Sequence, residues 1–221
     1  MTGRARVRST NLARPRPDPG TPRTTGIDKH PVDGIDVVAP GPRHGDGSGA
    51  VGDHVGDARH HGGADKAVYA VAREELDWWE GELGRVLRDG IFGENLTTSG
   101  IDLDGLELGR HLHVGSATLQ VSLPRQPCAT FARHLGEQRW VRRFTERGAC
   151  GAYLRVLVPG RISPGDPVGL GAPPGHGVSV RTAFAAAMGD LGAAREVVAA
   201  DVLPGRYHDA LARRVRAGAS R

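Results

Sequence analysis

Cysteine is scarce in this sequence, with only Cys128 and Cys150 among its 221 residues. Two thiols exclude a framework of several disulfides, and they exclude an iron–sulfur cluster held by four protein thiolates. Aromatic residues are only 5% of the chain, and no run approaches the ~20 apolar residues that span a membrane. The first residues also lack the apolar run of a secretory signal. These absences predict a chain that works in the reducing cytoplasm without membrane contact.

Positive charge is unevenly distributed along the chain. Residues 1–25 hold six Arg and one Asp, and residues 181–221 hold seven Arg against four acidic residues, although the whole chain is only +4. A nucleic-acid-binding domain is expected to carry its basic residues on the folded part, so this distribution argues against a nucleic-acid partner. Residues 1–25 are rich in Arg and Pro and lack apolar periodicity, so they predict a disordered leader. A polybasic arm that contacts phosphates stays an alternative for it.

Short apolar segments between turn signals predict a mostly β fold for residues 26–171. The chain contains 33 Gly and 15 Pro, which supply many turns. Alternation is clearest where Leu119, Val121 and Leu123 are separated by polar residues. This spacing is typical of an antiparallel sandwich or barrel. The apolar segments are residues 32–38, 103–108, 111–114, 117–123, 153–158 and 168–170.

Helical spacing occurs twice within this region, at residues 73–84 and 129–147. After a linker at 171–177, the C-terminal part predicts a three-helix extension over residues 178–218. Ser179 and Asp190 are the expected N-caps of its first two helices, 180–188 and 191–200, and Pro204 precedes the third, 206–217. Residues 40–65 have no periodicity, which is typical of a functional or mobile loop.

Cys128 is the leading candidate for chemistry. It follows an apolar segment in Pro124-Arg125-Gln126-Pro127-Cys128, where the two prolines restrict the backbone. Arg125 is close enough to favour the thiolate, which is the form that attacks electrophiles or binds metal. The alternative is a buried cysteine that acts as a small apolar residue. That structural role is the better interpretation for Cys150.

A candidate anion site lies in His61-Gly62-Gly63-Ala64-Asp65-Lys66. Paired glycines let backbone N–H groups approach an anion, and Lys66 adds a point charge. The spacing is not that of a P-loop, and a tight turn before a helix explains the segment equally well. In a further segment, Glu94 or Asn95 could hydrogen-bond a ligand ring, although Asn95 equally suits a turn.

Histidine and aspartate side chains between residues 44 and 61 offer a divalent-metal site as another hypothesis. Their spacing matches no metalloprotease motif. A metal-dependent hydrolase built on them would depend on His54 and His60. The residues concerned are His44, Asp46, Asp53, His54, Asp57, His60 and His61.

Five segments, in their combination and order, resemble the MOSC family, which is named for the C-terminal domain of molybdenum-cofactor sulfurase. The resemblance is closest to the YiiM-type branch, which is linked with 6-N-hydroxylaminopurine resistance and carries a C-terminal three-helix extension. It covers residues 26–217, nearly everything except the leader. The segments are Gly26–Val32, Gly52-Asp53 with His61–Tyr69, Phe92–Leu96, Pro124–Cys128, and Gly151–Tyr153 with Pro159-Gly160 and Gly165-Asp166.

The resemblance implies a compact β-barrel that binds molybdenum cofactor (molybdopterin). Cys128 matches the family's invariant cysteine and would be the molybdenum ligand and catalytic residue, in agreement with the soft character of a thiolate. The implied reaction is the reduction of an N-hydroxylated base or amine, and the family is also associated with pyridoxal phosphate binding. The positions suited to the cofactor's phosphate or pterin, or to the cleft around it, are Lys29, His61, Lys66, Asn95 and Arg125.

Such a reductase would need a separate electron-donor protein, because two cysteines cannot hold a cluster and no flavin or nicotinamide fold is visible. One alternative is a non-catalytic module that carries sulfur, as a persulfide on Cys128, or the cofactor itself. A second is the divalent-metal hydrolase, and a third is a barrel that has kept these turns without activity.

Overall fold

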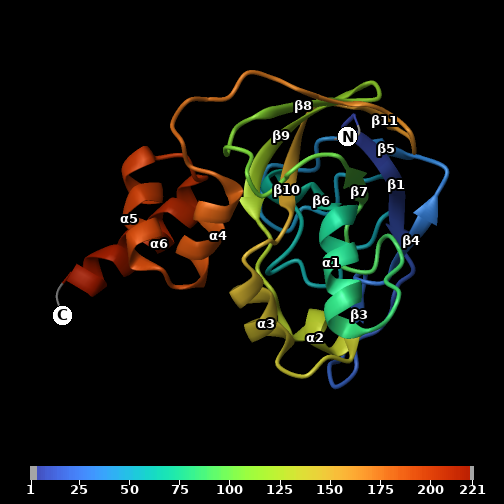
Figure 1. The fold of residues 1–221 in the computed structure, drawn as a ribbon, viewed down its shortest axis with the longest axis horizontal. Helices are drawn as coiled ribbons and strands as arrows, with labels where there is room; N and C mark the ends of the chain where they lie inside the picture. The colour runs from blue at the N-terminus through green and yellow to red at the C-terminus, as the bar shows by residue number, and fades with distance from the viewer. Residues whose placement is uncertain (1–3, 220–221) are drawn as a thin grey trace.

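The computed structural model describes residues 4–219, as a sheet-rich body with a helical lobe beside it (Figure 1). The strands are β1 (Arg6–Ala13), β2 (Arg16–Pro17), β3 (Thr24–Thr25), β4 (Lys29–Val32), β5 (Ile35–Val37), β6 (Val68–Ala72), β7 (Leu96–Ser99), β8 (His111–Val114), β9 (Ala117–Pro124), β10 (Ala152–Val158), β11 (Gly160–Ile162) and β12 (Val168–Leu170). The helices are a 3-10 turn η1 (Ala64–Lys66), α1 (Arg73–Leu83), α2 (Ala129–Leu135), α3 (Trp140–Arg147), α4 (Val180–Met188), α5 (Leu191–Ala200) and α6 (Gly205–Ala219).

Eight of these strands form one sheet in the order β12-β8-β9-β10-β6-β7-β1-β4. Neighbours are antiparallel, except that β6 and β7 run parallel with Ala70 opposite Leu96. Two small sheets pair β11 with β5 and β2 with β3. The prediction of a mostly β body is therefore confirmed in outline.

A closed barrel is not what the structure shows. The sheet has two ends, β12 and β4, and no strand pairing within residues 4–219 joins them. The chain at the start of β12 does meet the start of β1, through an isolated bridge between Arg6 and Pro167 and a bond from Val168 N to Ala5 O at 2.9 Å. β12 is only three residues long, and β4 contains Pro31, which has no N–H to donate to a further strand. The apolar segment 103–108 is not a strand either. It is a loop that bonds to the start of α4, where Val180 N donates to Leu106 O at 2.9 Å.

The disordered leader predicted for residues 1–25 is wrong for the part that the structure describes. β1 lies inside the sheet, between β4 and β7. Its inward side chains are partly polar, which hid the strand from a search for apolar periodicity. Thr10 Oγ1 donates to Val32 O at 2.7 Å, and Asn11 Nδ2 donates to Thr97 Oγ1 at 3.1 Å. Thr10 and Asn11 are both fully buried because the sheet supplies these partners.

The sequence predicted where the helices start better than it predicted how long they are. α1 lies where residues 73–84 predicted it, and the Ser179 and Asp190 side chains cap α4 and α5 as expected. The single helix predicted over 129–147 is wrong, because the chain breaks it into α2 and α3. Gly136 ends α2 in the left-handed region, at φ 69°.

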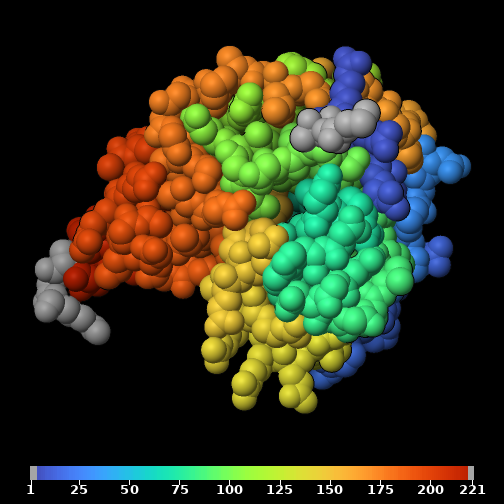
Figure 2. Space-filling view, viewed as in Figure 1, coloured from blue at the N-terminus to red at the C-terminus, as the bar shows by residue number. Residues whose placement is uncertain are grey.

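An aromatic cluster packs the helices of the body together. Trp79 of α1 and Trp140 of α3 have ring centroids 4.5 Å apart. Phe184 of α4 meets Phe144 of α3 edge-on at 6.0 Å, which attaches the helical lobe to the body. Figure 2 shows the lobe and the body in continuous contact. None of the helices in residues 4–219 is both long and apolar enough to cross a membrane.

Candidate functional site

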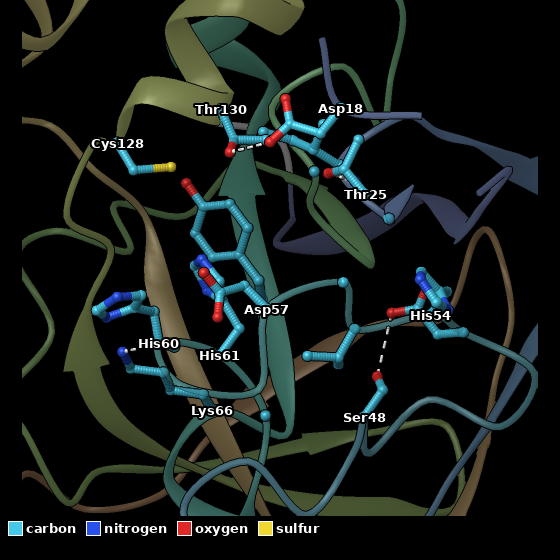
Figure 3. A pocket seen from close by; sticks show the side chains of 18 of the residues that line it. Asp18, Thr25, Ser48, His54, Asp57, His60, His61, Lys66, Cys128 and Thr130 are labelled. Atoms are coloured by element: carbon cyan, nitrogen blue, oxygen red, sulfur yellow. Dashed lines mark hydrogen bonds between the residues drawn. The ribbon is translucent and has the colours of Figure 1, made fainter. Parts of the chain in front are cut away.

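One cavity of about 390 Å³ opens between the end of β9, the start of α2, the β2–β3 hairpin and the loop around residues 48–62 (Figure 3). Every residue that the sequence singled out as catalytic or cofactor-binding lines it. These residues are Lys29, His61, Lys66, Asn95, Arg125 and Cys128. The structure therefore brings them together, while their roles stay predictions.

The segment Pro124–Cys128 carries two of these side chains into the cavity. β9 ends at Pro124, and Cys128 is the extended residue immediately before α2, at φ −140°. The prolines at both ends of the segment restrict its backbone. Cys128 is a free, partly exposed cysteine whose sulfur points into the cavity (Figure 3). A thiol so placed can bind a soft metal or accept sulfur.

The guanidinium of Arg125 is buried with no carboxylate partner among the described residues. Its Nη1 donates to the Tyr153 hydroxyl at 3.2 Å and lies 3.4 Å from His61 Nδ1. The rings of Tyr69 and Phe131 flank it at 5.7 and 5.4 Å. Its Nε is buried and makes no hydrogen bond with any residue that the structure describes. An unsatisfied buried donor is costly, so this arrangement favours an anionic ligand that would use it.

Lys66 is a second cation of the cavity with no carboxylate within 4 Å in residues 4–219. Its Nζ donates to His60 O at 2.8 Å and lies over the rings of Tyr153, at 5.5 Å, and Tyr207, at 5.4 Å. Burial, followed by the nearby Arg125, lowers the pKa of Lys66 to about 8. The ammonium form still predominates at pH 7.

His61 lies between these two cations. Burial, together with the positive charges of Arg125 and Lys66, lowers the pKa of His61 well below its usual value. Its imidazole is therefore neutral at pH 7 and can accept or donate one hydrogen bond at each ring nitrogen. In the structure its Nδ1 lies 3.2 Å from the Tyr153 hydroxyl.

Lys29 and Asn95 belong to a buried network centred on Asp53. The Lys29 ammonium is ion-paired with the Asp53 carboxylate. Asn95 Nδ2 donates to the same carboxylate at 2.9 Å, and Ser48 Oγ donates to it at 3.1 Å. Burial raises the pKa of Asp53, but Lys29 and Asn95 outweigh this and hold it below its usual value. The network fixes the loop around Asp53 against β4.

The remaining carboxylates that line the cavity are also held by protein partners. Asp18 accepts from Arg133 Nη2 at 2.7 Å and from Thr130 Oγ1 at 2.9 Å. Asp57 is ion-paired with Arg23. Six Lys or Arg residues line the cavity against three Asp. The excess positive charge therefore attracts anions, and Arg125 and Lys66 are the cations without a carboxylate.

Sequence reasoning missed the β2–β3 hairpin because it treated residues 1–25 as disordered. Asp18, Arg23 and Thr25 of this hairpin line the cavity. The turn signal of Pro17-Asp18-Pro19-Gly20 was available to predict a hairpin there. Tyr153 lay within a segment that carried the family resemblance, but it was not named as a site residue.

The histidines and aspartates of residues 44–61 do not converge on a metal site. His54 Nε2 lies 3.0 Å from Thr24 Oγ1, and His44 Nε2 bonds to Arg59 O at 2.8 Å. In the described part of the chain, no group of three or more His, Cys, Asp or Glu is placed to hold a metal ion. The divalent-metal hydrolase hypothesis therefore lacks its site.

Glu94 is a structural residue rather than a ligand contact. Its buried carboxylate accepts from Gly90 N at 2.6 Å, from Phe92 N at 2.9 Å and from Thr97 Oγ1 at 2.9 Å. These bonds organise the turn before β7. Cys150 is buried as well, which agrees with the structural role predicted for it.

Comparison with known proteins identifies relatives of this chain. A protein called YflK from Bacillus subtilis is 36% identical over 179 residues, which are 80% of this chain and 78% of that protein. YiiM from Escherichia coli is 30% identical over 125 residues, 55% of this chain and 56% of YiiM.

Solved structures extend the comparison to the whole fold. YiiM from Geobacillus stearothermophilus has a TM-score of 0.75 at 27% identity, and the match covers 96% of this chain and 99% of that one. The structure of YiiM from Escherichia coli gives 0.71 at 23% identity, covering 96% and 94%. The model of the MOSC domain matches residues 57–169, and the chain therefore belongs to the MOSC domain family.

Proposed function

We propose that this protein binds molybdenum cofactor in the cavity and reduces N-hydroxylated bases or amines, such as 6-N-hydroxylaminopurine. The observation that carries the proposal is the buried, carboxylate-free guanidinium of Arg125, with an unused Nε, three residues from the accessible thiol of Cys128. A soft ligand beside an anion site fits a group that contains both a soft metal and a phosphate.

The chain's own residues would divide the work between them. Cys128 would ligate molybdenum, and Arg125 and Lys66 would hold the phosphate. Neutral His61 and the Tyr153 hydroxyl, 3.2 Å apart, would hydrogen-bond the pterin or the substrate. The bound cofactor supplies two-electron chemistry at the metal, while the protein positions the substrate. The overall reaction consumes two electrons and two protons and releases the hydroxylamine oxygen as water.

The electrons would come from a separate donor protein, since two cysteines cannot form a four-thiolate cluster and residues 4–219 form no flavin or nicotinamide fold. We place the reaction in the cytoplasm, where reducing conditions keep Cys128 a free thiol. We do not extend the proposal to pyridoxal phosphate. The Lys29 amine, which a Schiff base could use, is ion-paired with Asp53, and our proposal assigns the Lys66 amine to the phosphate instead.

The first test is the molybdenum content of protein from a cofactor-producing host, compared with Cys128→Ser. Cys150→Ala is the matched control, since it removes the other free thiol. We expect near-stoichiometric molybdenum in the wild type and the control, and its loss in Cys128→Ser. Absence of molybdenum from all three would contradict the proposal.

The sulfur-carrier alternative rests on the same accessible thiol. It predicts a persulfide on Cys128, detected by mass spectrometry, and sulfur transfer without retained molybdenum. Reduction of 6-N-hydroxylaminopurine by the molybdenum-loaded protein with an electron-donor protein would separate the two functions. The reductase should be inactive without the donor, and turnover with nicotinamide nucleotide alone would contradict the need for a partner.

A further inference from the structure

We propose that the C-terminal helical lobe completes the anion-binding side of the cavity, with Tyr207 of α6 positioning Lys66 and Arg206 strengthening the positive field there. This inference deepens the proposed function, because it concerns the same cavity, but it rests on separate residues. Neither Arg206 nor Tyr207 lines the cavity itself. They would act through Lys66.

The contact of Lys66 with two tyrosine rings is the first support. Tyr153 comes from β10 of the body, and Tyr207 comes from the first turn of α6, and their ring centroids lie 5.5 and 5.4 Å from Nζ. Cation–π contacts with two rings restrict the long, flexible lysine side chain. The lobe therefore supplies half of the aromatic clamp.

The hydrogen bonds of Lys66 are the second support. An ammonium has three donors, and the protein acceptor seen for Lys66 is the single carbonyl of His60 at 2.8 Å (Figure 3). Lys66 also lines the cavity. An ammonium with unused donors and no carboxylate partner in residues 4–219 fits an incoming anion with several acceptor oxygens, such as a phosphate group.

Arg206 and His44 connect this clamp to the rest of the lobe and to the cavity loop. The Arg206 guanidinium lies 5.3 Å from the Tyr207 ring, and its charge is close enough to lower the pKa of Lys66. The Tyr207 hydroxyl lies 3.4 Å from His44 Nδ1. His44 in turn bonds to Arg59 O on the loop that lines the cavity. Tyr207 thus contacts both Lys66 and the loop.

The experiment measures protection of Lys66 by inorganic phosphate. Full-length protein from a host that makes no molybdenum cofactor is acetylated in increasing phosphate, and modification of Lys66 is followed by mass spectrometry. We expect phosphate to protect Lys66 in the wild type. Tyr207→Leu and Arg206→Gln should raise the half-protecting phosphate concentration about 3-fold or more, as expected for losing a cation–π clamp or a nearby charge.

Two variants serve as matched controls. Tyr207→Phe keeps the ring and loses only the hydroxyl, so it should behave like the wild type. Arg213→Gln removes an exposed arginine of the same helix and should also have no effect. Should Tyr207→Leu fail to fold, the exposed Arg206→Gln still tests the inference.

Wild-type-like protection in Tyr207→Leu and Arg206→Gln, or no protection of Lys66 in the wild type, would overturn the inference. Molybdenum content separates it from the proposed function. If molybdenum binding depends on Cys128 but phosphate protects Lys66 equally in the wild type, Tyr207→Leu and Arg206→Gln, the cofactor proposal stands and this inference is wrong. If the variants weaken phosphate protection as expected but no protein contains molybdenum, the anion site is supported and the cofactor proposal is wrong.

Discussion

Replacing Arg125 with methionine removes the buried guanidinium but keeps an unbranched chain that fills the place of the arginine stem. The guanidinium has no carboxylate partner among the described residues and leaves Nε unbonded, so no ion pair offsets the cost of removing its charge from water. We expect the cofactor-free variant to be as stable as the wild type or up to about 2 kcal/mol more stable in urea unfolding.

The same Arg125→Met variant should lose cofactor retention about 10- to 100-fold, because hydrogen bonds to charged groups contribute about 1.5–3 kcal/mol. Molybdenum content after gel filtration measures this loss. A variant that retained the cofactor while losing stability would show that Arg125 is a packing residue.

Lys29 and Asp53 should behave in the opposite way. The Lys29 ammonium and the Asp53 carboxylate form an ion pair within the protein, and their side chains are 8% and 2% exposed, respectively. Removing one partner of a buried pair typically costs about 3–5 kcal/mol, since the other charge is left alone. We expect Lys29→Met and Asp53→Asn each to lower the free energy of unfolding by about this amount. The double variant should cost less than the sum of the two single changes, and strict additivity would contradict the pairing.

At the scale of elements, the sequence predicted those whose signals are local. Ser179 and Asp190 mark helix starts by their capping oxygens, and α1 follows from apolar spacing. Elements defined by distant partners were missed or misjudged. β1 depends on polar bonds to β4 and β7, and the break between α2 and α3 depends on the left-handed Gly136.

Glu75 of α1 and Arg147 of α3 join two such elements across the aromatic cluster, with Arg147 Nη2 2.7 Å from Glu75 Oε2. Burial raises the pKa of Glu75 from 4.5 to about 7 in spite of Arg147. Between pH 4.5 and about 7, Glu75 is therefore protonated in the folded protein but ionised in the unfolded chain. The contribution of Glu75 to stability therefore falls as pH rises through this window.

Glu75→Gln should remove this part of the pH dependence, a change on the order of 1–3 kcal/mol between pH 4.5 and 7. Urea unfolding of the variant and the wild type at several pH values in this window measures it. Glu146→Gln, on the exposed face of α3, is the control and should keep the wild-type slope. An unchanged slope in Glu75→Gln would contradict the raised pKa.

At the scale of the whole molecule, the site gathers residues from nearly the full length of the chain. The sequence located Cys128, Arg125 and Lys66 from short motifs, because prolines, glycines and charges within a few residues carry that signal. It did not locate the hairpin around Asp18 or the role of Tyr207. Their neighbours in space are more than 100 residues away, at Arg133 and Lys66 respectively.

Deletion of residues 1–14 tests whether the fold depends on β1. The deletion removes β1, leaves β4 without its partner and exposes the edge of β7, which invites aggregation. It also removes the Ala13 N–H that donates to Asp53 at 3.0 Å, and the Asn11 N–H that donates to Asn95 O at 2.7 Å. We expect insoluble or unfolded protein, measured by soluble yield and circular dichroism.

Arg8→Ala is the matched control for this deletion, because it changes β1 only at an exposed ion pair with Asp89. It should cost no more than about 1 kcal/mol. A truncated chain that folded with the stability of the full chain would restore the interpretation of these residues as a dispensable leader. Partial folding with loss of Cys128-dependent molybdenum would instead mean that β1 supports the cavity through Asp53 and Asn95 rather than the fold as a whole.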